Sequence, residues 1–129
     1  MASLQALTAL GARGPAVVEI GPLRITERAD LALASVAARR GRFTDLAVAA
    51  QSAGVPLPEA AGYQAGAPYS AFWTAPDMWF VEAPFASHEL IAGLLKAALG
   101  DAASITEQTD AWVVFDLAAA DLAPVLERL

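Results

Sequence analysis

The stretch SAFWTAPDMWFVEAP, residues 70–84, decides the fold that the sequence predicts. Pro76 and Asp77 are residue types that favour the central positions of a β-turn. The segments on either side are rich in the aromatic and β-branched residues that strands prefer. We therefore expect a β-hairpin.

The second strand of this hairpin would be apolar on both faces. Met78 and Phe80 would lie on one face and Trp79 and Val81 on the other. Such a strand is either sandwiched inside a protein or pressed against another chain. We interpret the stretch as a buried or half-buried hairpin, and an aromatic cage for a small molecule is the alternative.

Working outward, the residues before the hairpin predict two strands and a helix. Residues 23–28 alternate apolar and polar side chains, which is typical of a strand. Residues 31–38 are rich in alanine, a poor strand former, so both strand and helix are possible there. Thr44 is an expected N-cap for a helix that Gly54 ends. A long loop rich in proline and glycine follows, over residues 55–70.

The residues after the hairpin predict a helix, a second hairpin and a last helix. Ser87 is the expected cap of a helix over 87–99, with an apolar stripe at helical spacing. Residues 103–117 read as a hairpin that turns near Asp110. A final helix would begin at Asp121, with Pro124 in its tolerated first turn.

This order of elements predicts an α+β fold. Its core would be a β-α-β-β-α-β unit, ferredoxin-like or aminomethyltransferase-like, with an antiparallel or mixed sheet and helices on one face. This core needs a strand over residues 31–38, a choice that the family resemblance described below favours over a helix. Residues 1–22 carry several glycines and little periodicity, so we expect a loosely structured lead-in before a single domain over 23–129.

Composition limits the possible functions. Of the 129 residues, 57% are hydrophobic and 17% charged, which is typical of a globular domain. No apolar run approaches the ~20 residues of a membrane helix, and the N-terminus lacks the features of a signal peptide. Eight basic against 14 acidic residues give a net charge of −6, which disfavours nucleic acid as a partner. We expect a cytoplasmic protein.

No motif predicts a catalytic, cofactor-binding or metal-binding residue in this chain. Cysteine is absent and His88 is the single histidine, which we interpret as an exposed residue. No serine lies in a G-x-S-x-G context, and no phosphate-binding glycine loop is present.

Two groups of charged residues need a separate interpretation. Four acids lie near predicted turns and could in principle serve acid–base chemistry, but they lack an identifiable partner, so we interpret them as solvated. A basic cluster is interpreted first as a solvated strand end and second as a patch that pairs with a partner subunit. The acids are Asp77, Glu107, Asp110 and Asp116, and the cluster is Arg39, Arg40 and Arg42.

Four blocks carry a resemblance to a known family. They are ITERADLALASVAARRG, FWTAPDMWFVEAP, ITEQTDAWVVFDL and LAPVLERL. Together they resemble the gamma subunit of heterotetrameric sarcosine oxidase, over residues 23–129. The second half is also remotely similar to the folate-binding domain of aminomethyltransferase. Members of the sarcosine oxidase family usually continue beyond the position of Leu129 through another strand-rich segment.

The resemblance implies a subunit of a bacterial enzyme that oxidatively demethylates sarcosine to glycine. In that family the alpha and beta subunits hold FAD, FMN, NAD and tetrahydrofolate, and the gamma subunit supplies no known catalytic residue. The partners implied here are those alpha and beta subunits. No cofactor is expected on this chain.

Two further hypotheses concern the tryptophans. A freestanding folate-binding module is the alternative function, with Trp73, Trp79 or Trp112 as a stacking surface for a pterin. The hairpin also suggests a contact surface, because one layer of helices covers only one face of a sheet. We expect the outward member of the Trp79/Phe80 pair to lie in a subunit or self-association interface.

Overall fold

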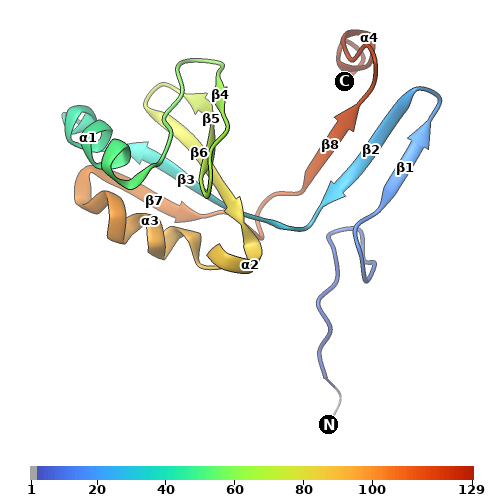
Figure 1. Cartoon of the computed structure of the whole chain (residues 1–129), viewed down its shortest axis with the longest axis horizontal. Helices are drawn as coiled ribbons and strands as arrows, with labels where there is room; N and C mark the ends of the chain where they lie inside the picture. The colour runs from blue at the N-terminus through green and yellow to red at the C-terminus, as the bar shows by residue number, and fades with distance from the viewer. Residues whose placement is uncertain (1–2) are drawn as a thin grey trace. The chain divides into compact units, whose positions relative to one another are not determined.

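The computed structural model describes residues 3–129, which contain short strands and helices in an α+β order (Figure 1). The strands are β1 Val17–Ile20, β2 Leu23–Arg28, β3 Leu31–Ala38, β4 Tyr63–Gln64, β5 Ser70–Ala75, β6 Met78–Pro84, β7 Ala103–Glu107 and β8 Val114–Ala118. The helices are α1 Phe43–Ala53, α2 Phe85–His88, α3 Ile91–Leu99 and α4 Ala123–Leu126, with a 3-10 turn at Gly100–Ala102.

The chain divides into two compact units. The core unit is Asp30–Ala111, and the terminal unit combines residues 3–29 with Trp112–Leu129. Each unit contains one antiparallel sheet. The described chain is therefore an α+β protein with two antiparallel sheets and four short helices.

The sheet of the core unit has the strand order β4-β5-β6-β3-β7. The predicted hairpin is confirmed as β5 and β6, joined through Pro76 and Asp77. Asp77 has φ 59°, a left-handed conformation that aspartate tolerates better than most residues. The alanine-rich segment is a strand, β3, inside the sheet, where it pairs with β6 on one side and β7 on the other and buries Ala32, Ala34 and Val36.

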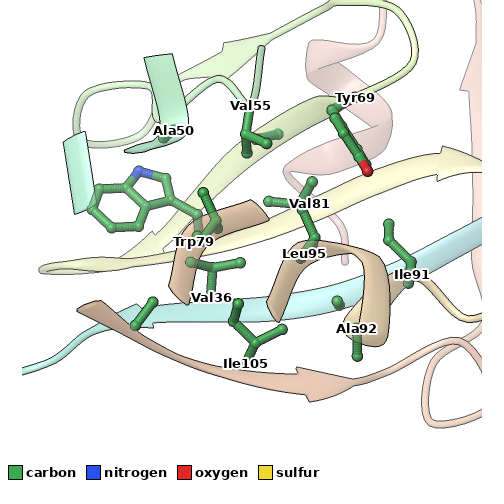
Figure 2. Close-up of a cluster of buried hydrophobic side chains, with 14 of the residues drawn as sticks. Val36, Ala50, Val55, Tyr69, Trp79, Val81, Ile91, Ala92, Leu95 and Ile105 are labelled. Atoms are coloured by element: carbon green, nitrogen blue, oxygen red, sulfur yellow. The ribbon is translucent and has the colours of Figure 1, made fainter. Parts of the chain in front are cut away.

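One face of this sheet carries the hydrophobic core. Val36, Val81 and Ile105 project from neighbouring strands toward α1 and α3 (Figure 2). Leu46 of α1 and Leu95 of α3 meet them and are fully buried. The apolar stripe predicted for the helix over 87–99 is only partly right. Ile91 and Leu95 pack inward, but Leu90, Leu94 and Ala98 are exposed, and the other inward positions are Ala92 and Leu99.

The terminal unit has a three-stranded sheet of order β1-β2-β8. Strand β1 lies within the stretch for which the sequence predicts only loose structure, and it pairs with β2. Three of its four residues are the β-branched Val17, Val18 and Ile20, so a local strand signal was present and the prediction of loose structure is wrong there. Helix α4 has four residues and begins after Asp121, whose carboxylate accepts a hydrogen bond from the Ala123 amide.

Three other local predictions are wrong. Residues 103–117 do not form a hairpin, because β7 pairs with β3 while β8 pairs with β2 in the other sheet. The predicted helix over 87–99 is interrupted, since α2 ends at His88 and α3 begins at Ile91. Arg42 rather than Thr44 is the N-cap residue of α1.

Candidate interaction site

The inner face of the hairpin decides what Trp79 does. Its side chain is 4% exposed, and its indole N–H donates a 2.8 Å hydrogen bond to the carbonyl oxygen of Pro58. The Phe43 ring lies 6.2 Å from it, centroid to centroid. Trp79 therefore fastens the long loop onto the sheet. It offers no open surface on which a pterin could stack.

Trp73 joins Trp79 in packing the core unit and does not form an open aromatic cage with it. Trp73 faces Trp79 across the β5–β6 pair and packs against the same core while staying half-buried. Trp112 belongs to the terminal unit. The structure thus assigns two of the three tryptophans to the packing of the core unit.

The outer face of the same sheet carries a row of three aromatic side chains, which we call the aromatic row: Tyr63, Phe72 and Phe80. Tyr63 lies directly opposite Phe72, which lies directly opposite Phe80. The two phenylalanine rings are 5.4 Å apart at an interplanar angle of 60°, an edge-to-face arrangement. The Tyr63 hydroxyl donates a 3.3 Å hydrogen bond to Glu82.

The aromatic row suits a protein surface better than a phosphate. Tyr63 is 59% exposed and the adjacent Met78 40%, whereas both phenylalanines are half-buried. The five strands of this sheet contain no lysine or arginine. Without cations the face cannot neutralise a nucleic-acid backbone. An apolar partner surface matches it.

A separate pocket of about 440 Å³ lies between the end of α1 and the long loop. Its lining is uncharged and includes Gln51, Gln64 and Tyr69. Burial raises the pKa of the Tyr69 phenol, which keeps that group neutral. The His88 ring meets Tyr69 edge-on with centroids 5.2 Å apart, so the phenol ring is held in place.

The basic cluster separates into one structural residue and two exposed ones. Arg42 bonds Asp45 at 2.6 Å and Asp101 at 3.1 Å, which joins the start of α1 to the 3-10 turn. The hydrogen bonds to these two acids raise the pKa of Arg42, and the bond from Arg42 lowers the pKa of Asp101. Arg39 and Arg40 are exposed.

The four predicted turn acids are not gathered into one site. Glu107 accepts hydrogen bonds from the Ala92 amide at 2.9 Å and the Thr109 hydroxyl at 2.6 Å, so it caps α3. Asp116 pairs with Arg28 at 2.8 Å in the terminal unit. Asp77 forms the hairpin turn. Asp110 is exposed.

No metal-binding group emerges from residues 3–129. Within them, no three side chains of histidine, aspartate or glutamate come together in a way that could hold an ion. The His88 Nδ1 lies 2.8 Å from the hydroxyl of Ser87. Likewise, no helix in this part of the chain is long and apolar enough to cross a membrane.

One buried acid, Glu27, was not among the residues that the sequence patterns singled out. Glu27 in β2 is 2% exposed, and its carboxylate accepts 3.1 Å hydrogen bonds from the amides of Leu10 and Ala16. A signal was available, because period-two alternation places Glu27 on the same face as Leu23 and Ile25. An acid on an apolar face must find partners or remain in water.

Comparison with known proteins gives a fold relationship. No family model matches the chain, and no curated protein matches it. Among solved structures, a chain of the heterotetrameric sarcosine oxidase from Corynebacterium sp. U-96, in complex with pyrrole 2-carboxylate, has a similar fold. The TM-score is 0.60, the identity is 24%, and the match covers 80% of this chain. The match spans 59% of the length of that sarcosine oxidase chain.

Proposed function

We propose that the protein is the gamma subunit of a heterotetrameric sarcosine oxidase and that it acts in assembly or stabilisation of the complex. The observation that carries this proposal is the fold it shares with a chain of such an enzyme. The sequence blocks quoted above supply independent support for the choice of subunit. The complex would work in the bacterial cytoplasm.

In this proposal the chemistry belongs to the alpha and beta subunits. FAD, FMN, NAD and tetrahydrofolate would be held by those chains, which demethylate sarcosine to glycine. The packing of Trp73 and Trp79 in the core unit supports this division, because it removes two of the three tryptophans as stacking surfaces. The chain itself is proposed to bind no cofactor.

We also propose that the core unit has the ferredoxin-like arrangement. Its elements follow the order β3, α1, β5, β6, α3 and β7, with β3 between β6 and β7. The two helices contribute to the same core on one face of the sheet. This leaves the opposite face, with the aromatic row, for a partner.

The subunit role is tested by co-expression with the alpha and beta sarcosine oxidase subunits of the same organism. We expect this chain to copurify with them in a fixed ratio. The isolated chain should show no flavin absorbance and no sarcosine turnover. Stoichiometric flavin on this chain alone, or a failure to copurify, would contradict the proposal.

The aromatic row provides a sharper version of this test. Changing Phe80 to Ser removes one ring whose burial against a partner is worth about 1.5–3 kcal/mol, or roughly tenfold or more in affinity. The thermal midpoint of the isolated chain should fall only modestly, through loss of the edge-to-face contact with Phe72. Leu94, 44% exposed on α3, provides the control substitution to Ser. Equal binding by the two variants would remove the aromatic row from the interface.

Titration with tetrahydrofolate separates the subunit from the folate-binding alternative. Because Trp79 is buried, we expect the tryptophan fluorescence of the isolated chain to stay flat. Saturable quenching at micromolar ligand would instead support a folate-binding module. The pocket beside Tyr69 would then be the first place to mutate.

A further inference from the structure

The sheet of the terminal unit has two chemically different faces. Four of its five charged side chains lie on one face, which we call the polar face. Arg24 pairs there with Glu19 at 4.0 Å and Arg28 with Asp116 at 2.8 Å. Cross-strand pairs of this kind satisfy each other while they remain in water. The polar face is therefore the solvent face.

The opposite face is apolar. The register places six aliphatic or aromatic side chains on it, and we call this surface the apolar face: Val18, Ile20, Leu23, Ile25, Phe115 and Leu117. Val18 is 47% exposed, Ile20 61% and Phe115 42%. Glu27 also lies on this face, at one end of it, where its carboxylate is buried and accepts hydrogen bonds from the amides of Leu10 and Ala16.

The terminal unit has no core of its own. Among residues 3–29 and 112–129, no hydrophobic side chain is buried, and the one buried residue is Glu27. A two-layer structure with a hydrophobic core is the ordinary way to stabilise a sheet. The sheet of the terminal unit therefore lacks, on its apolar face, the second layer of structure that would bury these side chains.

The core unit shows what the missing layer should be. There, α1 and α3 supply the second layer for five strands, and their inward side chains are fully buried. In the terminal unit three strands have only α4, which is four residues long. By the same ratio, a three-stranded sheet needs about one helix.

The dimensions of the apolar face also fit one helix. Three strands about 4.8 Å apart, the longest of six residues, give a face about 14 Å wide and about 20 Å long. A helix with its side chains is about 10–12 Å across and so fits the width of the face. At a rise of about 1.5 Å per residue, about 13 residues would span its length. The face has a projected area of about 280 Å². A symmetric contact with a second copy would fall well short of the roughly 800 Å² that a stable interface takes from each partner.

We propose that the apolar face receives an amphipathic helix of a different subunit, one with an uncharged aliphatic side toward the sheet. The proposal rests on the proposed function, which makes the alpha or beta subunit the partner. A large partner can add contacts elsewhere on this chain and so does not depend on this face alone. The fold likeness to a chain of a heterotetramer supports a partner of different sequence.

Photo-crosslinking in the assembled complex tests the proposal. A benzophenone amino acid replaces Ile20 or Phe115 on the apolar face. In matched controls it replaces Glu19 or Asp116, which are adjacent in the chain but on the polar face. Crosslinked peptides are identified by mass spectrometry. We expect strong crosslinks from the apolar face to one helical segment of the alpha or beta subunit and several-fold weaker ones from the controls.

An affinity measurement accompanies the crosslinking. Ile20→Ser should weaken binding to the alpha and beta subunits by about tenfold, whereas Glu19→Ser should leave it within about twofold. The crosslinkers at already exposed positions keep the test valid even if the Ser variant folds poorly. Equal losses for both substitutions would contradict a face-specific contact.

The outcomes separate the two proposals. If the chain does not copurify with the alpha and beta subunits, the proposed function fails and this inference fails with it. If it copurifies but the apolar face crosslinks to a second copy, to residues 30–111 or to no helix, this inference alone is overturned. Equal crosslinking from both faces would overturn it in the same way.

Discussion

The two units build sheets with the same strand alternation but stabilise them differently. In the core unit the apolar side chains of β3, β6 and β7 are buried beneath two helices. In the terminal unit Val18, Ile20 and Phe115 stay 42–61% exposed on a sheet that lacks such a layer. Alternation therefore determines which face is apolar, and the opposing layer determines whether that face contributes to stability.

The largest effect should come from separating the units. We expect residues 30–111 alone to unfold in one cooperative urea transition, because they contain the buried core. Residues 3–29 joined by a short linker to 112–129 should show no cooperative transition, since they bury no apolar side chain. Circular dichroism against urea measures both. A terminal fragment that folds by itself would contradict the comparison and favour two independent domains.

A substitution within the core unit should give the next largest effect. Leu95 is fully buried and its neighbour Leu94 is 44% exposed on the same helix. Leu95→Ala should lower the free energy of unfolding by about 2–5 kcal/mol through lost burial and a cavity. Leu94→Ala, which removes the same atoms, should cost about 1 kcal/mol or less. Equal losses of unfolding free energy in the two variants would mean that Leu95 does not lie in the core while Leu94 lies outside it.

Local signals were sufficient for the hairpin at residues 70–84. The turn residues Pro76 and Asp77 are adjacent, and strong strand formers lie on both sides, so everything needed is within one short stretch. Alternation also placed Trp79 and Phe80 on opposite faces, but it did not tell which ring points inward, and the packing of the helices makes that ring Trp79.

Local signals failed wherever pairing is long-range. The strand-like segments 103–107 and 114–118 each had the right character, but nothing within them specified pairing with β3 or with β2. The aromatic row likewise depends on Tyr63, which lies in a two-residue strand that only its partner β5 creates. The division of strands between two sheets is tertiary information that periodicity does not carry.

A smaller effect is expected where the core unit fastens its loop. Trp79→Phe keeps most of the ring volume but leaves the Pro58 carbonyl without its indole donor. The loss should be about 1–3 kcal/mol, with faster amide exchange concentrated in residues 55–66. Trp73→Phe is the matched control, since Trp73 packs against the same core while half-buried. Uniform exchange changes in both variants would show that the hydrogen bond has no local role.

The smallest effect should be confined to the terminal unit, at Glu27. Burial alone raises the pKa of Glu27, but hydrogen bonds from the Ala16 amide, the Thr8 side chain and the Leu10 amide outweigh it and lower the pKa below 4.5. The stabilisation from the ionised carboxylate is therefore complete above the unfolded pKa and is lost as the pH falls through the folded pKa.

Amide chemical shifts of Leu10 and Ala16, followed by NMR against pH, should report that loss with a midpoint below 4.5, the ordinary value for glutamate. In Glu27→Gln both amides should lose protection at neutral pH, because a neutral amide oxygen is a weaker acceptor than a carboxylate. Glu19→Gln on the polar face is the control and should leave them unchanged. The urea midpoint of the core unit should stay the same in both variants, since the hydrogen bonds given for the Glu27 carboxylate come from Thr8, Leu10 and Ala16 of the terminal unit. Retained protection of Leu10 and Ala16 in the Gln variant would mean that the loop is held by something other than this carboxylate.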